Sequence, residues 1–101
     1  MTQGLYKVSF SANGSSGDGV VVIENGQFVG GDSCLYYFGM FQEQGDAVTV
    51  VLHTHRHSDG DPSLLGEDDF NATLTGAVGD SGFTISSGPL VIVGVFLMNE
   101  F

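Results

Sequence analysis

Residues 33–56 read SCLYYFGMFQEQGDAVTVVLHTHR and have the composition of two paired β-strands. The arms SCLYYFGMF and DAVTVVLHTHR are rich in β-branched and aromatic residues and contain no proline, as is typical of strands. Residues 42–45 lie between the arms and predict a turn. We therefore expect the longest hairpin of an all-β protein in this segment.

Shorter segments of the same kind surround this hairpin, separated by turn residues. Asn25-Gly26 is the strongest turn signal, because both residues tolerate the positive φ angles of a type I′ hairpin turn. We expect strands at residues 4–11, 19–24, 27–32, 34–41, 46–56, 70–78, 83–87 and 90–98. Short turns between sequential strands predict an eight-stranded antiparallel up-and-down β-barrel, because closure removes the exposed sheet edges. An open sandwich of two four-stranded sheets is the alternative.

The composition limits the possible functions. With 101 residues, the chain is long enough for a single domain, 1–101. Hydrophobic residues make up 42% and charged residues 14%, which argues against disorder. The formal charge of -10 repels phosphate, so direct binding to nucleic acid or to an acidic membrane is disfavoured, whereas a basic protein partner would be attracted.

The location of the protein is predicted from features that the sequence lacks. Cys34 is the only cysteine, so no internal disulfide is possible. The N-terminal residues do not resemble a signal peptide. The longest apolar run, PLVIVGVFLM, is far shorter than the ~20 residues of a membrane helix. We expect a cytoplasmic protein without membrane insertion.

Two predicted strands, 34–41 and 90–98, are apolar on both faces. Since only one face of a barrel strand points inward, something must cover the other face. A second copy of the chain is the expected cover, which predicts a homodimer. The alternative is that the long connection at residues 57–69 folds over one of these faces.

The interior of an eight-stranded barrel is either just filled by side chains or holds one small ligand. If a ligand is held, the expected lining comes from the aromatic and β-branched positions Tyr6, Val8, Phe10, Tyr36 and Phe38. This predicts a small carrier or sensor for a hydrophobic ligand.

The return arm carries His53, His55 and His57, which alternate and so share one face of the strand. Neighbours along one face lie roughly 6.5 to 7 Å apart, close enough for two imidazoles to share a metal ion. HTHRHSD matches part of a cupin metal motif, a His-x-His pair followed by an acid, Asp59. The glycine of that motif lies too far upstream, and no histidine follows residue 57. A metalloenzyme using His53 and His55 is therefore a weaker hypothesis than histidines that face solvent or an interface.

The long connection, HSDGDPSLLGEDD, is strongly acidic through residues such as Glu67, Asp68 and Asp69. It is either a solvated loop or a docking surface for a basic partner. Its DGD segment lacks the central glycine and distal glutamate of a calcium loop. Elsewhere we find neither a nucleophile elbow nor a glycine-rich phosphate loop before a helix, so we expect a non-enzymatic protein without a cofactor.

Several short motifs occur in a characteristic order: GLYKVSF, GDGVVVIENG, GGD at 30–32, Gly39 and LHTHRH. In order and spacing, from about Gly4 to Phe96, they resemble the GrlR-like repressors of bacterial type III secretion genes. The resemblance implies a lipocalin-like eight-stranded barrel that dimerises and has an apolar cavity for a lipid-like molecule. It also implies that the protein represses transcription by sequestering a basic helix-turn-helix activator.

The resemblance departs from the family at one turn. Family members are expected to carry consecutive acidic residues before the fifth strand, whereas here the turn reads QEQGD, with Glu43 and Asp46 interrupted by other residues. The expected partner-binding residues are therefore Glu43, Asp46 and the acidic run 67–69. A regulatory binding protein is the first hypothesis, and the hydrophobic-ligand carrier is its alternative.

Overall fold

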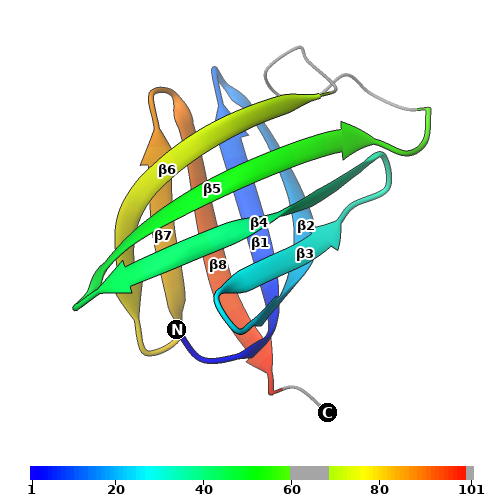
Figure 1. The fold of residues 1–101 in the computed structure, drawn as a ribbon. Coiled ribbons are helices and arrows are strands. Elements are labelled where there is room, and N and C mark those ends of the chain that lie inside the picture. The colour runs from blue at the N-terminus through cyan, green and yellow to red at the C-terminus, as the bar shows by residue number, and fades with distance from the viewer. Residues whose placement is uncertain (60–68, 100–101) are drawn as a thin grey trace.

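The computed structural model describes residues 1–59 and 69–99, which form a closed barrel of antiparallel strands (Figure 1). The strands are β1 (Gly4–Ala12), β2 (Ser15–Glu24), β3 (Gln27–Gly31), β4 (Leu35–Gln44), β5 (Ala47–Arg56), β6 (Phe70–Gly79), β7 (Gly82–Ser87) and β8 (Leu90–Met98). Each strand pairs with the next, and β8 pairs with β1 to close the sheet. The predicted all-β, eight-stranded up-and-down barrel is confirmed, and the sandwich alternative is wrong. None of the described residues belongs to a helix long and apolar enough to cross a membrane.

The hairpin turns depend on residues that tolerate positive φ. Asn25 and Gly26 have φ angles of 52° and 78°, as the type I′ prediction requires. Asn13 and Gly14 repeat this geometry with φ angles of 52° and 82°. Because that turn needs only two residues, β2 begins at Ser15, four residues before the predicted start at 19.

The central hairpin is longer than predicted. β4 and β5 pair without a break from Leu35 opposite Arg56 to Gln44 opposite Ala47. The turn is therefore Gly45-Asp46, which begins three residues later and ends one residue later than the predicted turn at 42–45, and Gly45 takes a φ of 62°. The two strands cross the barrel side by side (Figure 1).

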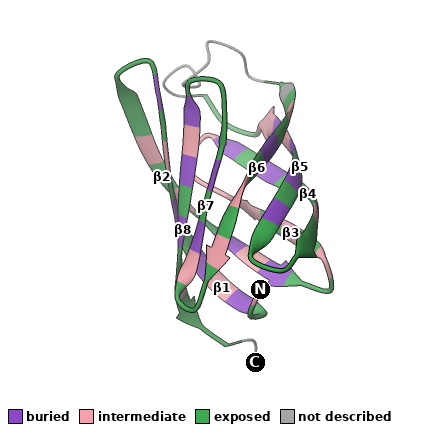
Figure 2. Ribbon diagram, turned by 90° about the vertical axis from the view of Figure 1, so that its left-hand side faces the viewer, coloured by how far each residue is buried: buried purple, intermediate pink, exposed green. Residues whose placement is uncertain are grey.

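Side chains alternate between the interior and the outside along each strand, as the banded colouring shows (Figure 2). The interior contains several close aromatic pairs. Tyr6 packs against Phe83 and Phe96 with ring centroids 5.8 and 5.4 Å away. Burial, and then the nearby charge of Glu43, raise the pKa of the Tyr6 hydroxyl, which donates a 2.5 Å hydrogen bond to the Thr2 carbonyl. The ring faces inward, as the alternation of β1 predicted.

Large apolar side chains also remain on the outside of the barrel. On β2 to β5 they form what we call the outer stripe, which consists of Val20, Val29, Tyr36, Phe38, Met40 and Val51. A second exposed row on β8 consists of Val93, Val95 and Leu97. β4 and β8 are therefore apolar on both faces, as predicted, and their cover by a second copy stays a prediction.

Candidate functional site

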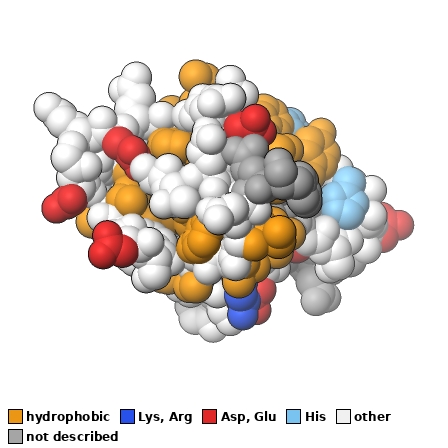
Figure 3. All heavy atoms as spheres, turned by 90° about the horizontal axis from the view of Figure 1, so that it is seen from below, with side chains coloured by type: hydrophobic (Ala, Val, Ile, Leu, Met, Phe, Trp, Pro, Cys, Tyr) orange, Lys and Arg blue, Asp and Glu red, His pale blue; other side chains and the backbone are white. Residues whose placement is uncertain are grey.

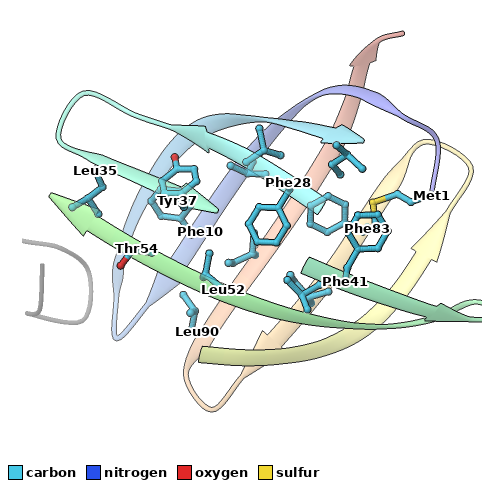
Figure 4. Close-up of a pocket in the computed structure, with 16 residues that line it drawn as sticks. Met1, Phe10, Phe28, Leu35, Tyr37, Phe41, Leu52, Thr54, Phe83 and Leu90 are labelled. Atoms are coloured by element: carbon cyan, nitrogen blue, oxygen red, sulfur yellow. The ribbon is translucent and has the colours of Figure 1, made fainter. Parts of the chain in front are cut away.

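An apolar cavity of about 90 Å³ lies inside the barrel (Figure 4). Its lining consists of Met1, Val8, Phe10, Val21, Ile23, Phe28, Leu35, Tyr37, Phe41, Val50, Leu52, Thr54, Phe83, Ile85, Leu90 and Ile92. Apart from the hydroxyl groups of Tyr37 and Thr54, the side chains of these lining residues are hydrocarbon or thioether. The cavity is thus suited to an uncharged, mainly apolar molecule.

The cavity has two different ends (Figure 4). Leu35, Tyr37 and Thr54 lie at one end, and Met1 and Phe41 lie toward the other. Met1 is unbranched and flexible, as is typical of residues that adapt to a ligand. Its side chain is only 2% exposed, and its ammonium group pairs with the Glu43 carboxylate. That ion pair holds the Met1 side chain in the lining.

At the first end, the Tyr37 hydroxyl is already engaged. It donates a 3.4 Å hydrogen bond to Asp32, whose other carboxylate oxygen accepts from the backbone N–H groups of Cys34 and Leu35 at 2.9 and 2.8 Å. Burial raises the pKa of Tyr37, and the charge and hydrogen bond of Asp32 and the charge of Asp18 raise it further. The phenol therefore stays a neutral donor that is directed to the β3–β4 turn.

Thr54 differs from Tyr37, although the two residues lie directly opposite each other on β5 and β4. Thr54 is only 4% exposed, so its polar side chain is buried in the core. Among the residues that the structure describes, no group forms a hydrogen bond with its Oγ1 atom. A buried hydroxyl without a partner is unfavourable, because it has lost its bonds to water. Thr54 thus brings an unpaired polar atom to the wall of an apolar cavity.

Of the five predicted cavity residues, two line the cavity. Val8 and Phe10 belong to the lining, and Tyr6 is buried in the core but is not a lining residue. The prediction for Tyr36 and Phe38 is wrong, since these side chains lie in the outer stripe and are 43% and 38% exposed. Their rings stack on each other on the outside, with centroids 6.3 Å apart.

The pairing of β4 with β5 explains this correction. Residues directly opposite each other in an antiparallel pair place their side chains on the same face. Tyr37 is opposite Thr54, which shares the inner face of β5 with Leu52, so odd-numbered positions of β4 point inward. Any turn between β4 and β5 with an even number of residues would place odd-numbered positions of β4 opposite even-numbered positions of β5. The alternation of β5 therefore indicated which face of β4 points inward. The sequence of β4 alone gives no such indication, because both of its faces are apolar.

Sequence reasoning also missed Phe28, Phe41 and Thr54 as lining residues. Phe41 follows from the same parity as Tyr37. Thr54 shares the inner face with Leu52, but a threonine in a strand is ordinary, and its lack of a partner becomes visible only with the neighbouring strands in place.

The sequence matches no protein-family model, and no curated protein matches it significantly. Function is therefore inferred from the geometry of the barrel, and the resemblance to GrlR-like repressors stays a prediction.

The three histidines lie near one another at the outer face, and each has a hydrogen-bond partner. Nδ1 of His53 is bonded to the amide oxygen of Asn71, and Nδ1 of His55 lies 3.0 Å from a carboxylate oxygen of Asp69. His57 uses Nε2 to reach the backbone carbonyl of Asp32 at 2.9 Å. These contacts tie β5 to β6 and to the β3–β4 turn.

The weaker metal hypothesis rested on His53 and His55. Their rings stack on Phe38, with centroid distances of 5.2 and 5.8 Å. Within residues 1–59 and 69–99, no three His, Cys, Asp or Glu side chains are grouped so that they could hold a metal ion. The described contacts thus favour aromatic packing of these histidines at the outer surface.

The predicted partner-binding residues are not brought together into one described patch. Glu43 pairs with the Met1 ammonium group, whereas Asp46 is exposed in the β4–β5 turn. Asp69 is 70% exposed and contacts His55, and residues 67 and 68 lie outside the described residues. From the lower end of Figure 1, acidic side chains are spread over the surface between hydrophobic ones (Figure 3).

Proposed function

We propose that this chain is a non-enzymatic binding protein that takes a small hydrophobic ligand inside its barrel. The observation that carries the proposal is the apolar cavity of about 90 Å³. An engineered apolar cavity of roughly 150 Å³ binds benzene, so this smaller cavity limits the ligand to about a single ring or a short alkyl chain. A longer, lipid-like molecule would require Met1 or Phe41 to move.

Native mass spectrometry of freshly purified protein, followed by titration with benzene, tests this proposal. We expect either a co-purified neutral organic molecule or a rise in melting temperature as benzene fills the cavity, because a ligand that binds only the folded state stabilises it. Val50→Phe would fill the cavity and should abolish the rise, and Val51→Phe on the outer face is the matched control. Absence of both a bound molecule and a benzene response in the parent protein would contradict the proposal.

A second function, favoured by the charge, is regulation through a protein partner. A net charge of -10 disfavours DNA binding and attracts a basic surface. Together with the resemblance to GrlR-like repressors, this supports a cytoplasmic regulator that sequesters a basic helix-turn-helix activator. The cavity ligand would then be able to regulate partner binding.

This second function is tested with a helix-turn-helix activator encoded beside the gene for this chain. We expect a complex that weakens with salt and that Asp46→Lys weakens further, because Asp46 lies at an exposed turn. Asp80→Lys, in the exposed β6–β7 turn, is the matched control. A complex insensitive to salt and to Asp46→Lys would exclude electrostatic docking at the β4–β5 turn.

A further inference from the structure

The unpaired hydroxyl of Thr54 indicates the chemical class of molecule that would bind in the cavity. Thr54 lines the cavity, is 4% exposed, and its Oγ1 has no hydrogen-bond partner among the described residues. A hydroxyl can both donate and accept a hydrogen bond. A ligand that offers one such bond at this position would therefore remove an unfavourable feature of the empty barrel.

The described side chains around Thr54 do not form a hydrogen bond with its Oγ1 atom, so this bond is available to a ligand. The hydroxyl of Tyr37, directly across on β4, is directed to Asp32. On the inner face of β5, one neighbour of Thr54 is the hydrocarbon side chain of Leu52. The other neighbouring position is Arg56, which is not a lining residue and donates a hydrogen bond to the carbonyl of Ser58. At this end of the cavity, Thr54 is thus the polar group that a bound molecule would meet.

The lining also restricts the charge of the ligand. The lining residues that the structure describes include no charged side chain, and the ammonium group of the lining residue Met1 is already paired with Glu43. A carboxylate or ammonium group on the ligand would therefore be buried without a free counter-ion. The net charge of -10 further disfavours anions. A neutral polar group is therefore favoured.

Resting on the proposed function, we propose that the ligand is a small neutral molecule with an apolar body and one hydroxyl or carbonyl group. Its oxygen bonds to Oγ1 of Thr54, and its apolar body extends toward Met1 and Phe41 (Figure 4). Phenols and short-chain alcohols belong to this class. Phenol and benzene form a matched pair of probes, because they differ by one hydroxyl group.

The test measures the affinity of the full chain for phenol and benzene by calorimetry. We expect Thr54→Val to weaken phenol binding roughly five-fold, the effect of one lost hydrogen bond, and to leave benzene binding unchanged or tighter. Thr54→Ser keeps the hydroxyl and should keep the preference for phenol. Thr49→Val makes the same substitution on the outer face of β5 and should behave as the parent does.

A second measurement needs no variant. In the parent protein, nuclear Overhauser effects from bound phenol should reach the methyl group of Thr54. Contacts confined to Met1 and Phe41, or equal phenol affinity of the parent and Thr54→Val, would overturn this inference while the cavity function stands. If neither phenol nor benzene binds to the parent and no molecule co-purifies with it, the cavity function itself fails. A preference that vanishes in Thr54→Val and returns in Thr54→Ser would establish the inference.

Discussion

Thr54 and Tyr37 show how two hydroxyl groups on opposite positions of one hairpin acquire different roles. Tyr37 reaches Asp32 at the β3–β4 turn, and the contact helps to hold this end of the barrel. Thr54 is shorter and has no described partner within reach. The difference follows from side-chain length on the same inner face, and it leads to two predictions at the scale of single residues.

Thr54→Val is expected to raise the free energy of unfolding of the ligand-free protein by about 1 kcal/mol. It replaces a buried hydroxyl without a partner by a methyl group of similar size. Thr49→Val on the outer face should change stability by less than about 0.5 kcal/mol. Urea denaturation of both variants measures the effect. A clear loss of stability in Thr54→Val would mean that the hydroxyl is satisfied in solution, for example by water.

The raised pKa of Tyr37 predicts that the protein loses stability in alkaline solution. In the unfolded chain the phenol ionises near its ordinary pKa of 10.0, whereas burial and Asp32 raise the pKa in the folded chain. Above pH 10 the folded state keeps a proton that the unfolded state releases, so stability falls with pH by at most about 1.4 kcal/mol per pH unit. Below pH 10 the contribution is present in full.

Tyr37→Phe should make this alkaline decline shallower, as measured by denaturation at a series of pH values. It should not abolish the decline, because the pKa of Tyr6 is also raised. Identical slopes in the parent and Tyr37→Phe would show that the phenol is not held neutral by the fold.

At the scale of elements, the close approach of strands depends on glycine. β3 pairs in register with β2 and β4 through both Gly30 and Gly31. The reason for glycine is space. A Cβ atom on Gly30 would lie 1.9 Å from the carbonyl oxygen of Val20 and 2.7 Å from the Cα of Val21.

Gly30→Ala is therefore expected to destabilise the protein by about 2 kcal/mol, since backbone rather than a movable side chain must shift. Gly79→Ala is the matched control, because a Cβ atom there meets nothing within 4 Å. Thermal unfolding compares the two variants. Equal melting temperatures would mean that the β2–β3 contact is looser in solution.

The elements also show what the sequence could predict and what it could not. Alternation placed the inward face of β1 correctly, because polar residues separate Tyr6, Val8 and Phe10. In β4 both faces are apolar, so alternation does not predict which face points inward. The inward face follows from the pairing of β4 with β5. Asn13-Gly14 is a turn signal of the same kind as Asn25-Gly26 and fixes the start of β2, whereas the predicted strands left the longer interval 12–18 between them.

At the scale of the whole molecule, the outer stripe and the row on β8 predict self-association. Exposed apolar side chains in such number are typical of interaction surfaces. We expect a homodimer through the outer stripe, where Met40 is 61% exposed. Met40→Glu would place an unpaired charge in that interface and should raise the dimer dissociation constant tenfold or more, on the order of 1.4 kcal/mol.

Light scattering over a range of concentrations tests this, with Leu97→Glu on β8 as the control. Dissociation by Leu97→Glu instead of Met40→Glu would move the interface to the β8 row. A parent protein that is monomeric at high concentration would contradict self-association altogether.

The sequence by itself favoured a closed barrel over an open sandwich, and it determined the eight strands and most of their turns. These depend on local alternation and on residues that tolerate positive φ, both of which are properties of short segments. Only the tertiary structure decided that β8 pairs with β1 to close the sheet, how large the cavity is, and that the Thr54 hydroxyl lacks a partner among the described residues. Those features depend on side chains from strands far apart in the chain, whose distances are fixed only when the sheet closes.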